Sequence, residues 1–183
     1  AVIMATSAAG KTAQYKLTVK TPSVKLNVSA KTLYVKGTPA TVTLKTTTAG
    51  VTGKVTYTSS KSSVASVDAK GKVTAASAGT AVITAKCGNY KATCKITVKK
   101  PTVKATASVN TLFVGGTSQV KVDRTGLTGK VTYGSSSKSV ATVSTSGKIT
   151  AKKAGTATIT VKCGSYKATC KITVKKRQPE DHV

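Results

Sequence analysis

Residues 57–100 read YTSSKSSVASVDAKGKVTAASAGTAVITAKCGNYKATCKITVKK, and residues 133–176 read YGSSSKSVATVSTSGKITAKKAGTATITVKCGSYKATCKITVKK. The two stretches align without a gap. Upstream, residues 21–38 match residues 100–117, and the small difference in length between the copies falls between Thr38 and Gly53. A repeat of this length, with several short strands inside it, predicts tandem β-sandwich domains rather than a solenoid.

The composition indicates an all-β chain. Thr, Val, Ser, Ala and Lys dominate, aromatic residues make up 4%, and no stretch has the periodicity of an amphipathic helix. Thr and Val favour a pleated, half-buried backbone. The last strand of the first copy alternates, with Ala92, Cys94, Ile96 and Val98 expected to face inward. Within the first copy, strands are expected at 24–28, 32–35, 42–45, 54–58, 64–67, 72–75, 80–87 and 92–99. 

Four segments are expected along the chain. Residues 1–20 match residues 81–99 with one extra loop residue, so they are expected to be the C-terminal hairpin of a truncated repeat. Complete repeats are expected at 21–99 and 100–176, and a disordered tail at 177–183. The joints at 20–22 and 99–101 are short and each contains a proline, which fixes its own φ. We therefore expect little bending between repeats and an extended rod.

Three motifs carry a family resemblance. They are S-S-x-x-S-V-A-x-V, G-K-[VI]-T-A and A-G-T-A-x-I-T, at 59–67, 71–75 and 78–84, and again at 135–143, 147–151 and 154–160. Together they resemble the group 2 bacterial immunoglobulin-like domains. The family commonly has Trp before the Ser-Ser motif, where this chain has Tyr57 and Tyr133. The resemblance implies tandem immunoglobulin-like β-sandwiches from a bacterial surface protein, an adhesin or a phage virion, and it implies no particular ligand.

The four cysteines lie in the two closing hairpins. If Cys87 lies opposite Cys94, and Cys163 opposite Cys170, the inward-facing thiols are close enough to form disulfides. The 1–20 segment has Ser7 and Tyr15 at the two positions, so both cysteines are missing together. A rival register has two-residue turns at 88–89 and 164–165, which leaves the thiols free and buried. A metal site is not expected, because no His lies near either pair.

Enzymatic chemistry lacks its usual residues. The one His is His182, in the tail, and each repeat has a single carboxylate, Asp68 or Asp123, at non-equivalent positions. A carboxylate dyad or a Ser-His-Asp triad cannot be assembled within a repeat. There is also no Gly-rich phosphate loop. We therefore expect no enzyme activity, no catalytic residue, no cofactor and no metal.

The net charge is +26, from 30 Lys and Arg against 4 Asp and Glu. Such a surface is either only solvated or attracts cell-wall polyanions or anionic glycans. The excess of Lys over Arg, without an exposed aromatic series, argues against specific nucleic-acid recognition. No apolar run is long enough to insert into a membrane. Tyr90 and Tyr166, near the hairpin tips, are candidate ligand contacts, whereas Tyr34 and Phe113 are expected in the core.

Three functions fit these observations. The first is a non-enzymatic stalk or spacer of a cell-surface or secreted bacterial protein, and the resemblance implies that extracellular location. The second is an adhesive module that binds an anionic polymer or a host ligand. The third is a phage virion decoration or tail component. The unpaired edges of the 1–20 hairpin also suggest end-to-end or strand-complemented self-assembly.

Overall fold

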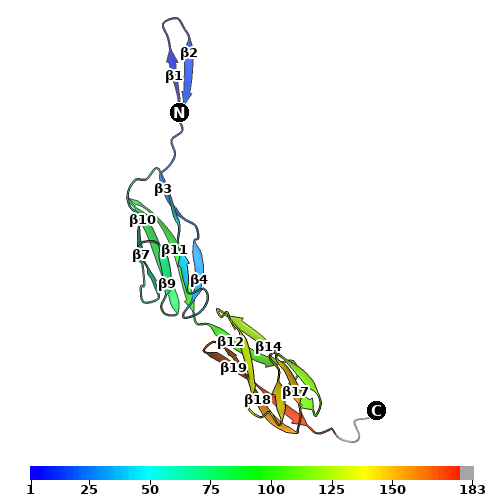
Figure 1. The fold of residues 1–183 in the computed structure, drawn as a ribbon. Coiled ribbons are helices and arrows are strands. Elements are labelled where there is room, and N and C mark those ends of the chain that lie inside the picture. Colours follow the sequence, from blue (N-terminus) through cyan, green and yellow to red (C-terminus); the bar gives the residue numbers. More distant parts are fainter. Residues whose placement is uncertain (178–183) are drawn as a thin grey trace. The chain divides into compact units, whose positions relative to one another are not determined.

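The computed structural model describes residues 1–177, and every regular element in them is a β-strand (Figure 1). The nineteen strands fall into three sets that share no sheet: β1–β2, β3–β11 and β12–β19. The all-β prediction is confirmed. None of the described elements is a helix that could span a membrane. The predicted tail lies, apart from Arg177, outside the described residues.

The first repeat forms three small sheets, ordered β4-β11-β10-β7, β5-β9-β8 and β3-β6. Its core contains Leu33, Val73, Ile83 and Ile96, all fully buried. The strands are β3 (Ser23–Leu26), β4 (Ala30–Tyr34), β5 (Thr41–Thr43), β6 (Thr46–Ala49), β7 (Thr56–Ser59), β8 (Ala65–Val67), β9 (Lys72–Ala75), β10 (Gly79–Cys87) and β11 (Tyr90–Lys99).

The second repeat forms two four-stranded sheets, ordered β12-β14-β17-β16 and β13-β19-β18-β15. All strand pairs are antiparallel except β13 and β19, which are parallel. The strands are β12 (Thr102–Ala107), β13 (Thr111–Phe113), β14 (Thr117–Thr125), β15 (Val131–Ser135), β16 (Ala141–Val143), β17 (Lys148–Ala151), β18 (Gly155–Cys163) and β19 (Tyr166–Lys175).

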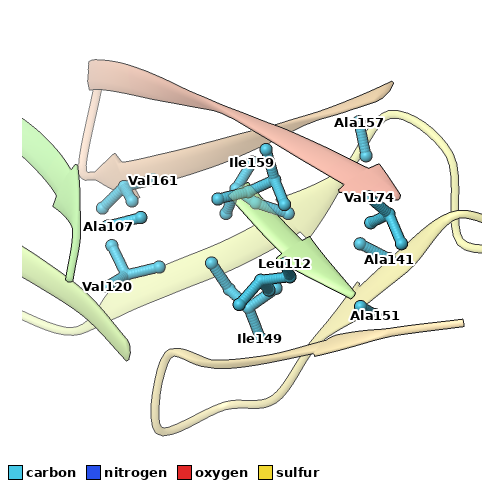
Figure 2. Packing of buried hydrophobic residues seen from close by; sticks show 11 residues of the cluster. Ala107, Leu112, Val120, Ala141, Ile149, Ala151, Ala157, Ile159, Val161 and Val174 are labelled. Carbon is cyan, nitrogen blue, oxygen red and sulfur yellow. The ribbon is translucent and has the colours of Figure 1, made fainter. Parts of the chain in front are cut away.

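The core of the second repeat is built from alternate residues of its strands, as a half-buried sheet requires. In β18 the residues Ala157, Ile159, Val161 and Cys163 are buried, and the residues between them reach solvent. Figure 2 shows Ile159 and Val161 packed among side chains of the facing sheet, including Ile149 and Val120. The predicted tandem β-sandwich fold is therefore confirmed, while the predicted domain bounds stay a prediction.

The strand predicted at 42–45 is wrong in its extent. The first repeat has β5 and β6 there, separated at Leu44 and Lys45, whereas the second has the single strand β14. Leu44 turns inward and its N–H donates to the carbonyl of Gly71 at 2.8 Å. The Asn27 side chain accepts from the Lys45 N–H at 2.9 Å, and the Asn27 N–H donates to the Lys45 carbonyl at 3.0 Å. Asn27 thus pairs with both backbone groups of Lys45 at the break between β5 and β6.

The expectation that Tyr34 and Phe113 lie in the core is wrong. The buried residues are their predecessors, Leu33 at 0% and Leu112 at 7% exposure, whereas Phe113 is 44% exposed and Tyr34 is half-buried. Successive side chains of a strand point to opposite faces, so a shift of one residue exchanges the core face for the solvent face.

The β1–β2 hairpin, β1 (Val2–Thr6) with β2 (Thr12–Lys16), forms a sheet of its own. Ile3 lies opposite Tyr15, and both side chains are exposed. The matching residues of β10 and β11, Ile83 and Cys94, are fully buried. The interpretation of this hairpin as the end of a further repeat stays a prediction.

Candidate functional site

The cysteines of the second repeat are held apart by the register of its closing hairpin. Cys163 lies opposite Tyr166, and Cys170 lies opposite Ile159. Cys170 is four residues beyond Tyr166 on β19, which is about 13 Å along the strand. This separation exceeds the limit of about 7 Å between Cα atoms that a disulfide allows.

The predicted disulfides are therefore wrong, because all four cysteines are free thiols. The first repeat has the same two-residue turn, with β10 ending at Cys87 and β11 beginning at Tyr90. Gly88 and Gly164 have φ of +56° and +57° at the first central position of each turn, as a type II′ turn requires. The turn chemistry thus selects the register that places a Tyr opposite each first cysteine.

The buried thiols have local partners. The Cys87 thiol donates to the carbonyl of Gly53 at 3.4 Å, and the Cys163 thiol approaches the carbonyl of Thr128 at 4.0 Å. Arg124 Nη1 lies 3.9 Å from Cys163 Sγ. Burial raises the pKa of the Cys94 and Cys170 thiols. A raised pKa keeps these two groups as neutral thiols, which are poor nucleophiles and poor metal ligands.

Other candidate residues occupy structural positions. The Asp68 carboxylate accepts the N–H groups of Lys70 and Lys72, each at 2.9 Å, and so holds a turn. Tyr90 is 40% exposed and Tyr166 is half-buried, each at the start of its strand. Their role as ligand contacts stays a prediction. Within residues 1–177, no three or more His, Cys, Asp or Glu side chains gather in a way that could hold a metal ion.

The Ser-Ser motif ties strands together. In the second repeat the Ser135 hydroxyl donates to the Ala141 carbonyl at 2.7 Å, and the Ser136 hydroxyl accepts from the Thr158 N–H at 2.9 Å. In the first repeat Ser59 and Ser60 make the same two bonds, at 2.7 and 2.9 Å. The motif is therefore part of the fold in both repeats.

The outer face of the sheet β13-β19-β18-β15 is a grid of hydroxyls and ammonium groups. The register places Thr132 beside Lys162, and Lys162 beside Lys167. In the next outward row, Gly134 lies beside Thr160, and Thr160 beside Thr169. None of the four strands contains Asp or Glu. This face combines positive charge with many hydrogen-bonding groups.

A hollow of about 320 Å³ opens on this face. A Cβ atom on Gly134 would meet no atom within 4 Å, so the glycine leaves a gap in the layer of outward side chains. The hollow is lined by Thr132, Tyr133, Gly134, Ser135, Ser136, Thr160 and Lys162.

Sequence reasoning missed this hollow, although a signal was present. The repeats read Y-T-S-S and Y-G-S-S at this point, so Gly134 replaces Thr58 in otherwise matching strands. A glycine inside a strand weakens it and often marks a place where a ligand or another backbone approaches.

Comparison with known proteins gives a family and a fold. The family model described as Big-like, Bacterial Ig-like domain matches residues 53–100 and 129–176, which together make up more than half of the chain. The search of curated proteins gives no match.

Solved surface-layer structures share the fold. The S-layer protein rSbsC is 23% identical over 87% of this chain, with a TM-score of 0.52, and domains 1–6 of SbsC are 24% identical over 87%, with the same TM-score. The chain spans 28% of the length of each of these two. A fragment with SbsC domains 4 and 5 is 23% identical over 85% of this chain and 98% of the fragment, with a TM-score of 0.51.

Proposed function

We propose that this chain, which belongs to the bacterial Ig-like domain family, is a non-enzymatic structural spacer of a cell-surface or secreted bacterial protein. The observation that carries the proposal is the tandem construction. Each repeat has its own sheets and its own buried residues, and only Lys100 and Pro101 lie between β11 and β12. A two-residue joint that contains proline leaves little slack for bending.

The surface location draws on two lines of support. The family resemblance implies a bacterial surface protein, and the solved structures that share the fold include S-layer proteins. The high positive charge favours contact with polyanionic cell envelopes. Antibody labelling of intact cells that express the protein tests the location directly. Labelling only after lysis would contradict it.

A spacer must lengthen with each repeat. Small-angle scattering of the chain and of a variant that lacks residues 100–176 measures this. Since a ten-residue strand is about 33 Å long, we expect the deletion to shorten the maximum dimension by at least about 30 Å. Equal maximum dimensions would mean that the repeats fold back on each other, and the spacer role would fail.

The joint provides a matched control. An insertion of eight Gly and Ser residues after Lys100 adds a flexible coil without changing either core. Distances between spin labels on the two repeats should be narrowly distributed in the native chain and broadly distributed in the insertion variant. An equally broad distribution in the native chain would contradict a stiff spacer.

A further inference from the structure

The second repeat carries a feature that a spacer does not need. Lys162 and Lys167 lie directly opposite each other on the outward face of β18 and β19. The Thr158 carbonyl accepts from the Ser136 N–H of the neighbouring chain segment, so the even-numbered residues of β18 bond toward β15. Lys162 and Lys167 therefore form a non-hydrogen-bonded pair, in which opposed side chains are closest. Like charges in such a pair repel, and an anion between them would relieve the repulsion.

The hollow at Gly134 lies one row from this pair. Thr160 lies opposite Gly134, and Thr132 lies opposite Lys162. Three residues with hydroxyl groups, Thr132, Ser136 and Thr160, line the hollow together with Lys162. Its volume of about 320 Å³ is at the lower end of the range of about 300–1,000 Å³ found for small-molecule sites. The site thus joins a positive end to a row of hydroxyls.

The first repeat provides the contrast within the same chain. It keeps the lysines at the matching positions, Lys86 and Lys91, both exposed. Thr58 stands where the second repeat has Gly134, and Val82 stands where it has Thr158. The first repeat therefore keeps the charges but places a side chain in the gap and an apolar group beside it.

We propose that the outer face of the second repeat binds an acidic saccharide. A sugar ring lies over Gly134, and its carboxylate or sulfate group lies between Lys162 and Lys167. The hydroxyls of Thr132 and Thr160 pair with those of the sugar, and the absence of a side chain at Gly134 lets the ring approach the sheet. Nucleic acid is the less suitable polyanion, since Tyr133 is the one aromatic residue of the lining and is half-buried, whereas single strands need a series of stacking platforms. This inference is independent of the spacer role.

The test is an NMR titration, at 150 mM salt, in which each probe is added to the isotopically labelled chain. The amide chemical shifts report binding. The probes are a sulfated heparin hexasaccharide, an oligogalacturonate of six residues, neutral maltohexaose and a six-nucleotide single-stranded DNA. We expect shifts centred on 132–136 and 158–169 with at least one of the acidic saccharides, and none with maltohexaose. The two acidic probes distinguish sulfate from carboxylate. Tighter binding of the DNA, or no binding by either acidic saccharide, would overturn the proposal.

Two variants separate a built site from general electrostatic attraction. Gly134→Thr installs the residue of the first repeat, and we expect it to weaken binding about tenfold, which corresponds to about 1.4 kcal/mol. The double variant Lys162→Gln with Lys167→Gln should weaken binding at least as much and flatten its dependence on salt. Lys86→Gln with Lys91→Gln, in the first repeat, should leave these shifts unchanged. The proposal fails if Gly134→Thr binds as tightly as the native chain, or if the first-repeat variant loses as much affinity as the Lys162/Lys167 variant. Either result would mean that binding is only non-specific electrostatic attraction.

Discussion

Cys163 lies opposite Tyr166 across the hairpin of β18 and β19, with two residues between them in the turn. This pairing sets the partner of every residue along the two strands. It carries Cys170 to a position opposite Ile159 and brings Lys162 and Lys167 together on the outer face. One turn therefore keeps the thiols apart on the inner face and concentrates charge on the outer face.

The register predicts where a disulfide can be engineered. Lys162→Cys with Lys167→Cys places two thiols at a non-hydrogen-bonded pair, where Cα atoms are about 4.5 Å apart. We expect this variant to form a disulfide in mild oxidant, detected by mass spectrometry of the unreduced digest. Lys162→Cys alone serves as the control and should form no bond with Cys170. A native Cys163–Cys170 disulfide in the same digest would contradict the register.

The inward faces of these hairpins could be predicted from the sequence, but their register could not. The register that pairs Cys163 with Cys170 differs from the observed one by four residues. Because four is an even number, both registers keep Ile159, Val161 and Ile172 on the inner face. Hydrophobic alternation is therefore equally satisfied by both, and the Gly164 turn decides between them.

The other sequence-based predictions fail where the alternation of hydrophobic and polar residues is weak. In β4 and β13 the adjacent residues Leu33-Tyr34 and Leu112-Phe113 are all large and hydrophobic, so the pattern does not say which of each pair faces inward. The strand β6 lies in a run of threonines, which gives no contrast between faces. The hollow at Gly134 depends on side chains from two strands, and a linear sequence does not show which residues become neighbours.

Burial of the Cys94 and Cys170 thiols predicts a pH dependence of stability. Their pKa is raised in the folded state, so the folded chain keeps protons that the unfolded chain loses. The stabilisation is complete below the unfolded thiol pKa of about 8.5 and declines as the pH rises through the higher folded pKa. We expect the free energy of unfolding to fall between pH 8 and 10. Denaturant titrations at each pH measure it.

The matched variant for this prediction is Cys94→Ala with Cys170→Ala. It loses packing at every pH, but it should lack the thiol contribution to the slope between pH 8 and 10. Equal slopes in the variant and the native chain would show that the thiols do not contribute. A thiol-reactive reagent should also detect four free thiols in the denatured chain without prior reduction, since none is bonded.

The phenol of Tyr57 makes two hydrogen bonds that should stabilise the first repeat. Its Oη lies 2.7 Å from Thr46 Oγ1 and donates to the Leu44 carbonyl at 3.3 Å. Tyr57→Phe should lower the free energy of unfolding by about 1 kcal/mol, because partly buried partners lose their hydrogen bond. A double-mutant cycle with Thr46→Val measures the coupling between the two side chains. A coupling energy of zero would mean that the Tyr57–Thr46 contact adds nothing to stability.

An added methyl group at Gly71 in the first repeat should be costly. Its φ is +78°, and a Cβ there would lie 2.6 Å from the Leu44 carbonyl oxygen and 2.8 Å from the Tyr57 ring. Gly115 has a similar φ of +85° but nothing within 4 Å of its Cβ position. Gly115→Ala should therefore show the backbone strain alone, about 1–2 kcal/mol. Gly71→Ala should cost roughly 3 kcal/mol or more, because steric overlap adds to that strain. Chemical denaturation of each variant measures both values, and equal losses would show that the Leu44 and Tyr57 contacts yield without cost.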